Sequence, residues 1–147
     1  MTLQQAARVA PTDHKGLRVL TLDECLRRLG ESPVGRLAFH LDGEIAVLPV
    51  NHTLAGTDVC FRILGGSRIK VAVDLAPVSF EVVPYDESAR AGWSVLVRGT
   101  AVIVSDPADV RRLEGMAREP WAPGDPSETT WIRVRAQAIT GRSLDRV

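Results

Sequence analysis

VGRLAFHLDGEIAVLPVN, at residues 34–51, is the stretch that indicates the fold class of this chain. It consists of two runs, 34–41 and 44–51, joined by Asp42-Gly43. Apolar residues recur with a period of two in both runs, which is typical of β-strands. Asp42-Gly43 between the runs is a two-residue hairpin signal, so the strands are expected to be antiparallel neighbours. Pro49 lies within the second run and cannot donate to a ladder, which predicts a strand edge or a bulge. Backbone groups there are candidates for ligand contact.

Strand patterns continue through most of the remaining chain. DVCFRIL (58–64) follows a turn at residues 55–58, so three consecutive antiparallel strands are expected. Further strand patterns occur in VSFEVVPY (78–85), GWSVLVRGTAVIVS (92–105) and TTWIRVRAQA (129–138). Six strands joined mostly by short turns predict an antiparallel sheet that closes or curls to hide its edges. The expected fold class is mainly β with helices, an α+β fold.

Three helices are expected to cover the openings of this sheet, at residues 22–29, at residues 67–76 and from residue 107 onward. Thr21 and Glu24 fit a capping box, and Gly30 is expected to end the first helix. Asp106 and Pro107 fit the N-cap and the first position of the last helix.

The charges of the chain balance, with 18 Lys and Arg residues against 18 Asp and Glu residues. A neutral chain has no overall field to attract nucleic acid or an anionic membrane, so neither is expected as a partner. Cys25 and Cys60 lie far apart, without a C-x-x-C motif or a Cys/His cluster, and His14, His40 and His52 are dispersed. No disulfide framework and no metal site is therefore expected.

The N-terminus carries no targeting pattern. Residues 1–16 are polar and without a sustained period, which predicts a mobile leader followed by a single domain at residues 17–147. A basic segment followed by an apolar stretch is absent, and no window approaches the ~20 apolar residues of a membrane span. A cytoplasmic location is expected.

A candidate anion site lies where the third strand runs into the second helix. Arg62 and Ile63 end the strand, glycines follow at 65 and 66, and Ser67 and Arg68 begin the helix with Ser67 as the expected N-cap. Glycines allow close backbone approach to an anion, and arginines add forked donors. The alternative is an ordinary loop with a solvated face. The spacing of a Walker loop is absent, so NTP hydrolysis is not indicated.

Catalytic side chains are not identifiable from the sequence. No serine lies in a G-x-S-x-G frame, and no side chain is an obvious general acid or base. Trp93, Trp121 and Trp131 could stack on a planar ligand or could close the edge of the core. His52 follows Pro49-Val50-Asn51 at a strand end, and the alternative is an ordinary surface or hydrogen-bonded histidine.

Several motifs together resemble the pyridoxamine 5′-phosphate oxidase-like flavoproteins, in particular a small actinobacterial branch related to nitroimidazole-resistance proteins. The motifs are LTLDECLRRL (20–29), SPVGRLAF (32–39), VLPVN (47–51), FRILGGSRI (61–69) and GWSVLVRGTA (92–101). The resemblance covers about residues 19–143. It implies a six-stranded split β-barrel that binds FMN at the interface of a homodimer.

The resemblance also implies which residues hold the cofactor. VLPVN is similar to the strand beside the isoalloxazine ring, so backbone groups of Pro49, Val50 and Asn51 are expected to face it. FRI is similar to the usual F-R-T, so Arg62 and Ile63 are expected to contact the phosphate and the ribityl chain, Ile63 through its backbone.

GSRI in turn is similar to the usual G-S-K-L, so Ser67 and Arg68 are expected to hold the phosphate. Arginine in place of lysine keeps the charge and changes its geometry.

The function implied is an FMN-dependent oxidoreductase, a reductase acting on a small molecule. Two alternatives stay open: a non-catalytic module of the same fold that binds a flavin, a deazaflavin or haem, and a structural dimer with an empty cleft. Oxidation of pyridoxamine phosphate itself is not expected, because the C-terminal substrate-binding pattern of the true oxidases is missing.

Overall fold

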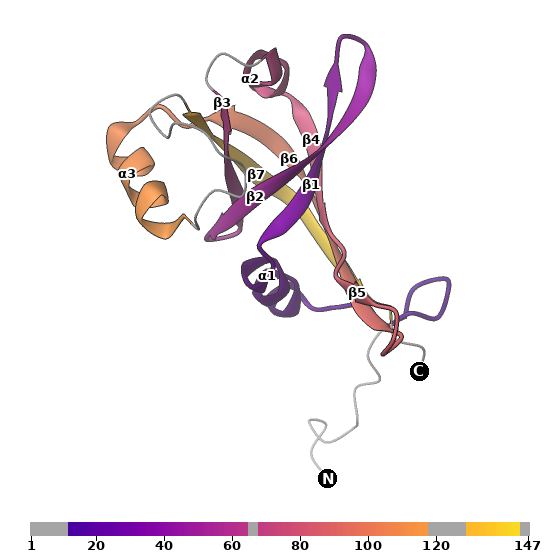
Figure 1. Cartoon of the computed structure of the whole chain (residues 1–147). Helices are drawn as coiled ribbons and strands as arrows, with labels where there is room; N and C mark the ends of the chain where they lie inside the picture. Colours follow the sequence, from indigo (N-terminus) through magenta and orange to yellow (C-terminus); the bar gives the residue numbers. More distant parts are fainter. Residues whose placement is uncertain (1–11, 65–67, 118–128, 145–147) are drawn as a thin grey trace.

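Six antiparallel strands close into a barrel in the computed structural model, which describes residues 12–64, 68–117 and 129–144 (Figure 1). The barrel strands are β1 (Val34–Leu41), β2 (Glu44–Ala55), β3 (Asp58–Leu64), β4 (Pro77–Val82), β6 (Ala91–Ile103) and β7 (Thr129–Ser143). They follow the order β4-β1-β2-β3-β7-β6, and a β4–β6 pairing closes the ring. A two-residue strand, β5 (Tyr85–Asp86), pairs with the start of β6. The predicted α+β fold with a six-stranded split barrel is confirmed.

The β1–β2 hairpin forms as its turn signal predicts. Asp42 and Gly43 both adopt positive φ, 51° and 80°, which is the conformation of the two central residues of a type I′ turn. The pairing then runs without interruption from Leu41 opposite Glu44 to Val34 opposite Asn51. The turn therefore sets the register of the strand that carries Pro49.

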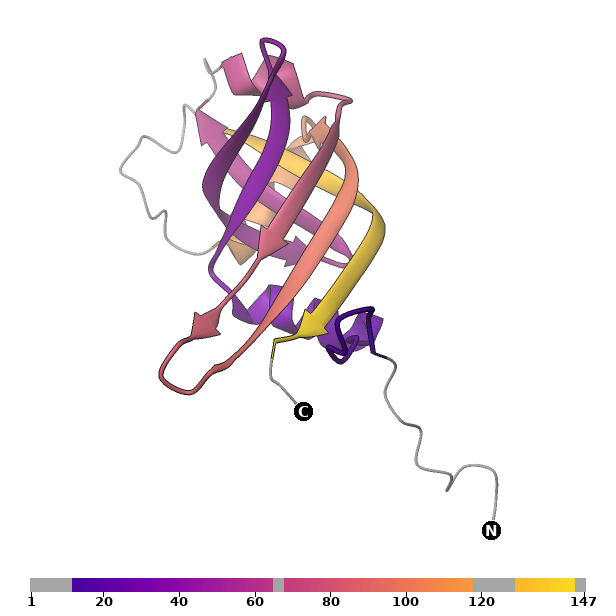
Figure 2. The same ribbon diagram turned by 90° about the vertical axis from the view of Figure 1, so that its right-hand side faces the viewer.

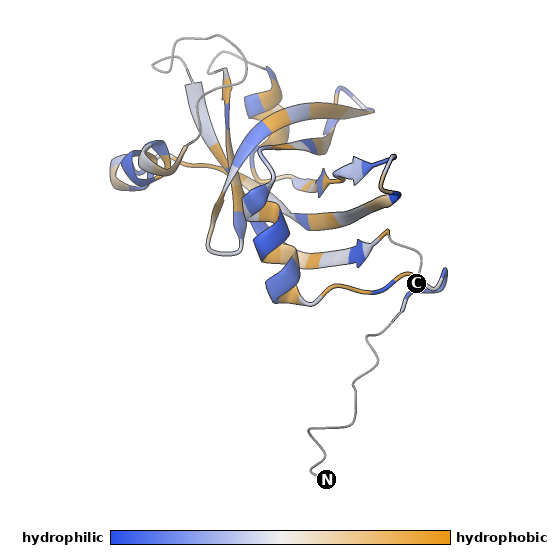
Figure 3. Cartoon of the chain, turned by 60° about the horizontal axis from the view of Figure 1, so that its bottom comes forward, coloured by the Kyte–Doolittle hydropathy of each residue, from blue (hydrophilic) through white to orange (hydrophobic). Residues whose placement is uncertain are grey.

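Alternate residues of the strands fill the barrel interior. Hydrophobic and hydrophilic residues accordingly alternate along the strands (Figure 3). The largest fully buried side chains in the described residues are Phe61, Phe80, Leu29, Leu37 and Ile132. Gly35 of β1 leaves room for the Phe80 ring, because a Cβ at residue 35 would lie 2.1 Å from a ring carbon. The core thus depends on close packing as well as on apolar area.

Three helices surround the barrel. α1 (Leu22–Glu31) covers one end, the short α2 (Arg68–Val73) lies at the opposite end, and α3 (Pro107–Met116) packs against the outside (Figures 1 and 2). Asp106 caps α3 as predicted, accepting a hydrogen bond from the Ala108 N–H. Within the described ranges, no helix has the length and apolar character needed to cross a membrane.

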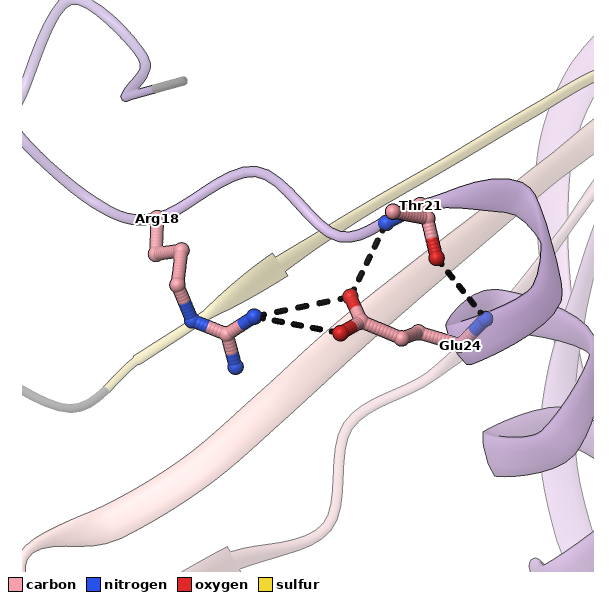
Figure 4. A network of polar contacts seen from close by, with 3 residues as sticks. All are labelled: Arg18, Thr21 and Glu24. Atoms are coloured by element: carbon pink, nitrogen blue, oxygen red, sulfur yellow. Dashed lines mark hydrogen bonds and ion pairs between the residues drawn. The ribbon is translucent and has the colours of Figure 1, made fainter. Parts of the chain in front are cut away.

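The predicted capping box begins α1 (Figure 4). Thr21 Oγ1 accepts from the Glu24 N–H at 3.2 Å, and Glu24 Oε2 accepts from the Thr21 N–H at 2.9 Å. Arg18 Nη1 donates to Glu24 Oε1 at 3.3 Å. The expectation that Gly30 ends the helix is wrong: α1 continues through Glu31, and the residue before Pro33 leaves the helical conformation.

The last strand is longer than its sequence pattern predicts. Arg98 lies opposite Ala138 and Gly99 opposite Ala136, so Gln137 is an extra residue in β7. This bulge reverses the alternation: the buried residues of the barrel core before it are Ile132 and Val134, at even numbers, and the buried positions after it are Gly141 and Ser143, at odd numbers. A sequence pattern with a constant period of two therefore ends at residue 138.

Part of the expected leader packs on the barrel. Asp13 Oδ2 accepts from Arg142 Nη1 at 2.7 Å, and Asp13 Oδ1 accepts from the Leu17 N–H at 3.0 Å. Thr12 and Arg18 form a β-bridge across this turn. Residues 1–11 lie outside the described residues, and the division at residue 16 stays a prediction.

Candidate functional site

Strands β2 and β3 separate at a fork. They pair only from His52 opposite Phe61 to Ala55 opposite Asp58. Before His52, Glu44–Asn51 pairs with β1 on one side and, among the described strands, with none on the other. After Phe61, Arg62–Leu64 pairs with β7 alone. We call these two segments, Glu44–Asn51 and Arg62–Leu64, the β2–β3 fork.

Pro49 lies at the open edge of this fork. It is opposite Arg36 in an unbroken register with β1, so the segment contains no bulge. The prediction of a strand edge at the proline is confirmed. Because proline has no N–H, it is tolerated where no second strand requires a donor.

The fork brings together two of the three predicted site motifs. Pro49, Val50 and Asn51 lie on its β2 side, and Arg62 and Ile63 on its β3 side. Val50 and Ile63 have side chains buried in the barrel core, so only their backbones can reach a ligand. Pro49 is exposed and Asn51 is half-buried, and the alternation of both strands places them on the outer face with Arg62.

The β2 side of the fork is apolar as well as open. Ile45 is 73% exposed and Val47 is 60% exposed, and both share the outer face with Pro49. Exposed branched side chains next to an uncovered strand edge provide apolar surface together with backbone donors and acceptors. A flat, apolar ligand with a polar edge is complementary to such a surface.

Of the third motif, the structure describes only Arg68 and Ile69. Ser67 lies outside the described residues. Arg68 is the first residue of α2 and is exposed, and its Nη2 donates to Asp42 Oδ2 of the β1–β2 turn at 2.5 Å. Exposed pairs of this kind contribute little stability, so this one does not fix Arg68 firmly.

Arg62 is held in a tight cluster under α3. Its side chain is 15% exposed, its Nη1 donates to Glu114 Oε2 at 3.1 Å, and its guanidinium carbon lies 5.2 Å from the centre of the Trp131 ring. Trp131 Nε1 donates to Glu114 Oε1 at 2.8 Å. Both oxygens of one carboxylate are therefore engaged. We call Arg62, Glu114 and Trp131 the α3 cluster.

Glu114 is the residue of this region that sequence reasoning did not select. It lies 52 positions after Arg62 on a helix whose pattern is otherwise ordinary. No local signal links the two residues. Arg62 on β3 is paired with Trp131 on β7, and α3 packs over both strands. This packing brings Glu114 into contact with Arg62.

Among the described residues beside the fork, Cys60 and His52 are buried. Cys60 is fully buried under α3 with Leu113 and Trp131, and burial raises the pKa of its thiol to about 11. His52 is buried, its Nε2 donates to the Leu29 carbonyl oxygen at 2.8 Å, and its ring meets Phe80 edge-on. Both residues pack the barrel in this structure.

The structure also shows where Trp93 and Trp131 lie and whether the described residues group potential metal ligands. Trp131 is buried at the edge of the core, and Trp93 lies 5.3 Å from the guanidinium carbon of Arg28. Trp121 lies outside the described residues. In the part of the chain that the structure describes, no group of three or more His, Cys, Asp or Glu residues could hold a metal ion.

Several known proteins are similar to this chain in sequence or in fold. The family model described as pyridoxamine 5′-phosphate oxidase matches residues 21–143. The uncharacterized protein Rv0080 of Mycobacterium tuberculosis is 30% identical over 143 residues, 91% of this chain and 90% of that protein.

Two solved structures are similar over most of their length. The FAD binding protein from Mycobacterium smegmatis is 32% identical with a TM-score of 0.73, and the match covers 85% of this chain and 98% of that one. A conserved protein of unknown function, DIP1874 from Corynebacterium diphtheriae, is 29% identical with a TM-score of 0.72. That match covers 86% of this chain and 97% of DIP1874. Since the family model spans most of the sequence, the chain belongs to the pyridoxamine 5′-phosphate oxidase family.

Proposed function

We propose that this protein binds a flavin nucleotide at the β2–β3 fork and uses it as an oxidoreductase. The observation that carries the proposal is the fork itself: an apolar strand segment, Glu44–Asn51, with a strand partner on one side, next to the cationic Arg62. The flavin ring is flat and apolar with hydrogen-bonding atoms along one edge. The fork offers the complementary groups.

Each residue on the β2 side has a defined part in this proposal. Backbone groups of Pro49, Val50 and Asn51 face the polar edge of the ring. Ile45 and Val47 supply apolar surface beside it. Because these contacts are made by a strand held in register with β1, the ring position is set before the ligand arrives.

The phosphate side of the ligand requires positive charge. Arg62 is the proposed primary contact, and Ile63 takes part through its backbone because its side chain is buried. Ser67 and Arg68 are the proposed second contact. Arg68 is exposed and only weakly held by Asp42, so its guanidinium is available to an anion.

FMN is the proposed nucleotide, because the family resemblance implies it, and FAD is a second candidate because the Mycobacterium smegmatis relative is named a FAD binding protein. Both carry the same ring and a phosphate. A bound flavin supplies hydride or electron transfer, and the protein supplies position, electrostatics and access. The substrate is a small molecule that reaches the ring from outside the barrel.

We also propose that two chains associate with the cofactor at their interface. A six-stranded barrel filled by its own side chains has no room for a flavin inside. Ile45 and Val47 are exposed on the face that carries the fork, and a second chain would cover them together with the ligand.

The absorption spectrum of the purified, untreated protein tests cofactor binding. We expect the visible bands of an oxidised flavin, and micromolar or tighter binding when FMN or FAD is added. Arg62→Gln should weaken binding of both nucleotides, whereas Arg27→Gln, an exposed site on α1, should not. Absence of flavin bands and of binding refutes the proposal, and a haem or deazaflavin spectrum establishes the alternative module.

Turnover is tested separately with the flavin-loaded protein. Under a steady supply of NADH or NADPH, we expect the flavin absorption to bleach and to recover when an electron acceptor is added. Tight binding without any bleaching or recovery would support the non-catalytic alternative.

A further inference from the structure

The charge of Arg62 is already balanced inside the protein. Glu114 accepts from Arg62 through one carboxylate oxygen and from the Trp131 indole through the other, at 3.1 and 2.8 Å. The guanidinium also lies over the Trp131 ring. Both oxygens of this carboxylate are therefore engaged by other residues of the α3 cluster.

Helix α3 carries this carboxylate to the outer side of the barrel. Leu113, the neighbour of Glu114, is buried against Cys60 and Trp131, so the helix is anchored there by apolar contacts as well as by charge. Arg62 and Trp131 face it from opposite positions on β3 and β7. A phosphate that approaches Arg62 therefore meets the negative charge of Glu114 at contact distance from the same guanidinium.

We propose that Glu114 is an internal competitor for Arg62 and sets the preference of the site for ligands with or without a phosphate. This inference rests on the proposed flavin site. The Glu114 side chain is 39% exposed and that of Arg62 15%, and like charges that share one guanidinium repel, so a phosphate gains Arg62 only when Glu114 gives it up. A flavin without a phosphate does not need this exchange.

The variant Glu114→Gln distinguishes the effect of the carboxylate charge from the effect of the size of the side chain. Glutamine keeps the length of the side chain and an oxygen that accepts from the Trp131 indole, and it removes the competing charge. We expect FMN to bind about tenfold more tightly to this variant than to the native protein, with riboflavin binding unchanged. The ratio of the riboflavin and FMN dissociation constants should therefore rise about tenfold.

Asp109→Asn is the matched control. Asp109 lies on the same helix, pairs with Arg112 at 3.5 Å, and its replacement removes the same charge without touching the α3 cluster. The ratio of the riboflavin and FMN dissociation constants should be the same in Asp109→Asn as in the native protein. In an Arg62→Gln background the further change Glu114→Gln should no longer raise the ratio of the riboflavin and FMN dissociation constants, because the group for which phosphate and Glu114 compete is gone.

The indole N–H of Trp131 provides a second measurement that needs neither turnover nor flavin. Its NMR resonance, assigned by replacing each tryptophan in turn with Phe, reports the bond to Glu114. Titration with inorganic pyrophosphate should shift this resonance as the carboxylate is displaced. Glu114→Gln should bind pyrophosphate at lower concentration than the native protein does.

The possible outcomes distinguish this inference from the proposed function. If FMN binds and the ratio does not change in Glu114→Gln, or changes equally in Asp109→Asn, Glu114 is not a competitor and the flavin proposal stands. If no variant binds a flavin, the proposed function fails, and the pyrophosphate titration alone decides the role of Glu114. An unmoved Trp131 resonance with bound pyrophosphate overturns the inference.

Discussion

At the scale of single residues, the missing Cβ of Gly35 is what allows the Phe80 ring to lie against β1. Gly35→Ala places a methyl group 2.1 Å from a ring that is fully buried, so the ring must move within a close-packed core. We expect a loss of ~1–3 kcal/mol in the free energy of unfolding, measured by urea denaturation. Gly30→Ala is the control: open space surrounds that site in α1, and alanine should stabilise by up to ~1 kcal/mol. Equal effects of the two variants would contradict this account.

The two cysteines form the second prediction at this scale. Burial raises the pKa of Cys25, and it raises that of Cys60 to about 11, so the reactive thiolate is scarce at pH 8. We expect neither thiol to react with Ellman's reagent in the folded protein, and we expect both to react rapidly when the protein is unfolded in urea. Cys25→Ala isolates the signal of Cys60. Rapid reaction of the folded variant would show that α3 does not shield this thiol.

At the scale of elements, the capping box links α1 to pH. The Thr21 N–H, and then Arg18, hold the pKa of Glu24 below its ordinary value. A lowered pKa means that the ionised carboxylate stabilises the fold above the ordinary carboxyl range and that this stabilisation is lost as pH falls through the lowered pKa. We therefore expect Glu24→Gln to be less stable than the native protein near neutral pH, with the difference shrinking below about pH 4.

Thermal unfolding followed by circular dichroism across this pH range measures the effect. Asp23→Asn removes the same charge from the first turn of α1 and leaves the capping box intact. The stability difference between Asp23→Asn and the native protein should change less with pH than the difference for Glu24→Gln does. A Glu24→Gln curve parallel to that of the native protein at every pH would disprove the role of the carboxylate.

At the scale of the whole molecule, the exposed apolar face of β2 predicts the oligomeric state. We expect a homodimer in light scattering. Val47→Glu should yield a folded monomer, because the substitution adds charge to a side chain that is already 60% exposed in the single chain. Leu22→Glu, an exposed apolar site on α1, should remain dimeric. A native monomer, or a Val47→Glu dimer of unchanged affinity, would exclude this face as the interface.

Local patterns in the sequence were sufficient for most of the fold. The period of two found the six strands, Asp42-Gly43 found the hairpin turn, and the capping residues found the starts of α1 and α3. Each of these signals acts between neighbours in the chain, through hydrogen bonds or turn geometry that a few residues specify. The end of β7 escaped prediction because a bulge opposite β6 changes the phase of the pattern.

The candidate site shows the opposite case. Sequence motifs selected Pro49, Val50, Asn51, Arg62 and Ile63, yet only strand register shows that these residues flank one fork. Glu114 was not selectable at all, since its contact with Arg62 depends on how α3 packs over β3 and β7. Most elements and the family resemblance could be predicted from the sequence alone, because they depend on short-range periodicity and motifs. The tertiary structure alone decided which charges meet, because segments far apart in the chain come together only when the barrel closes.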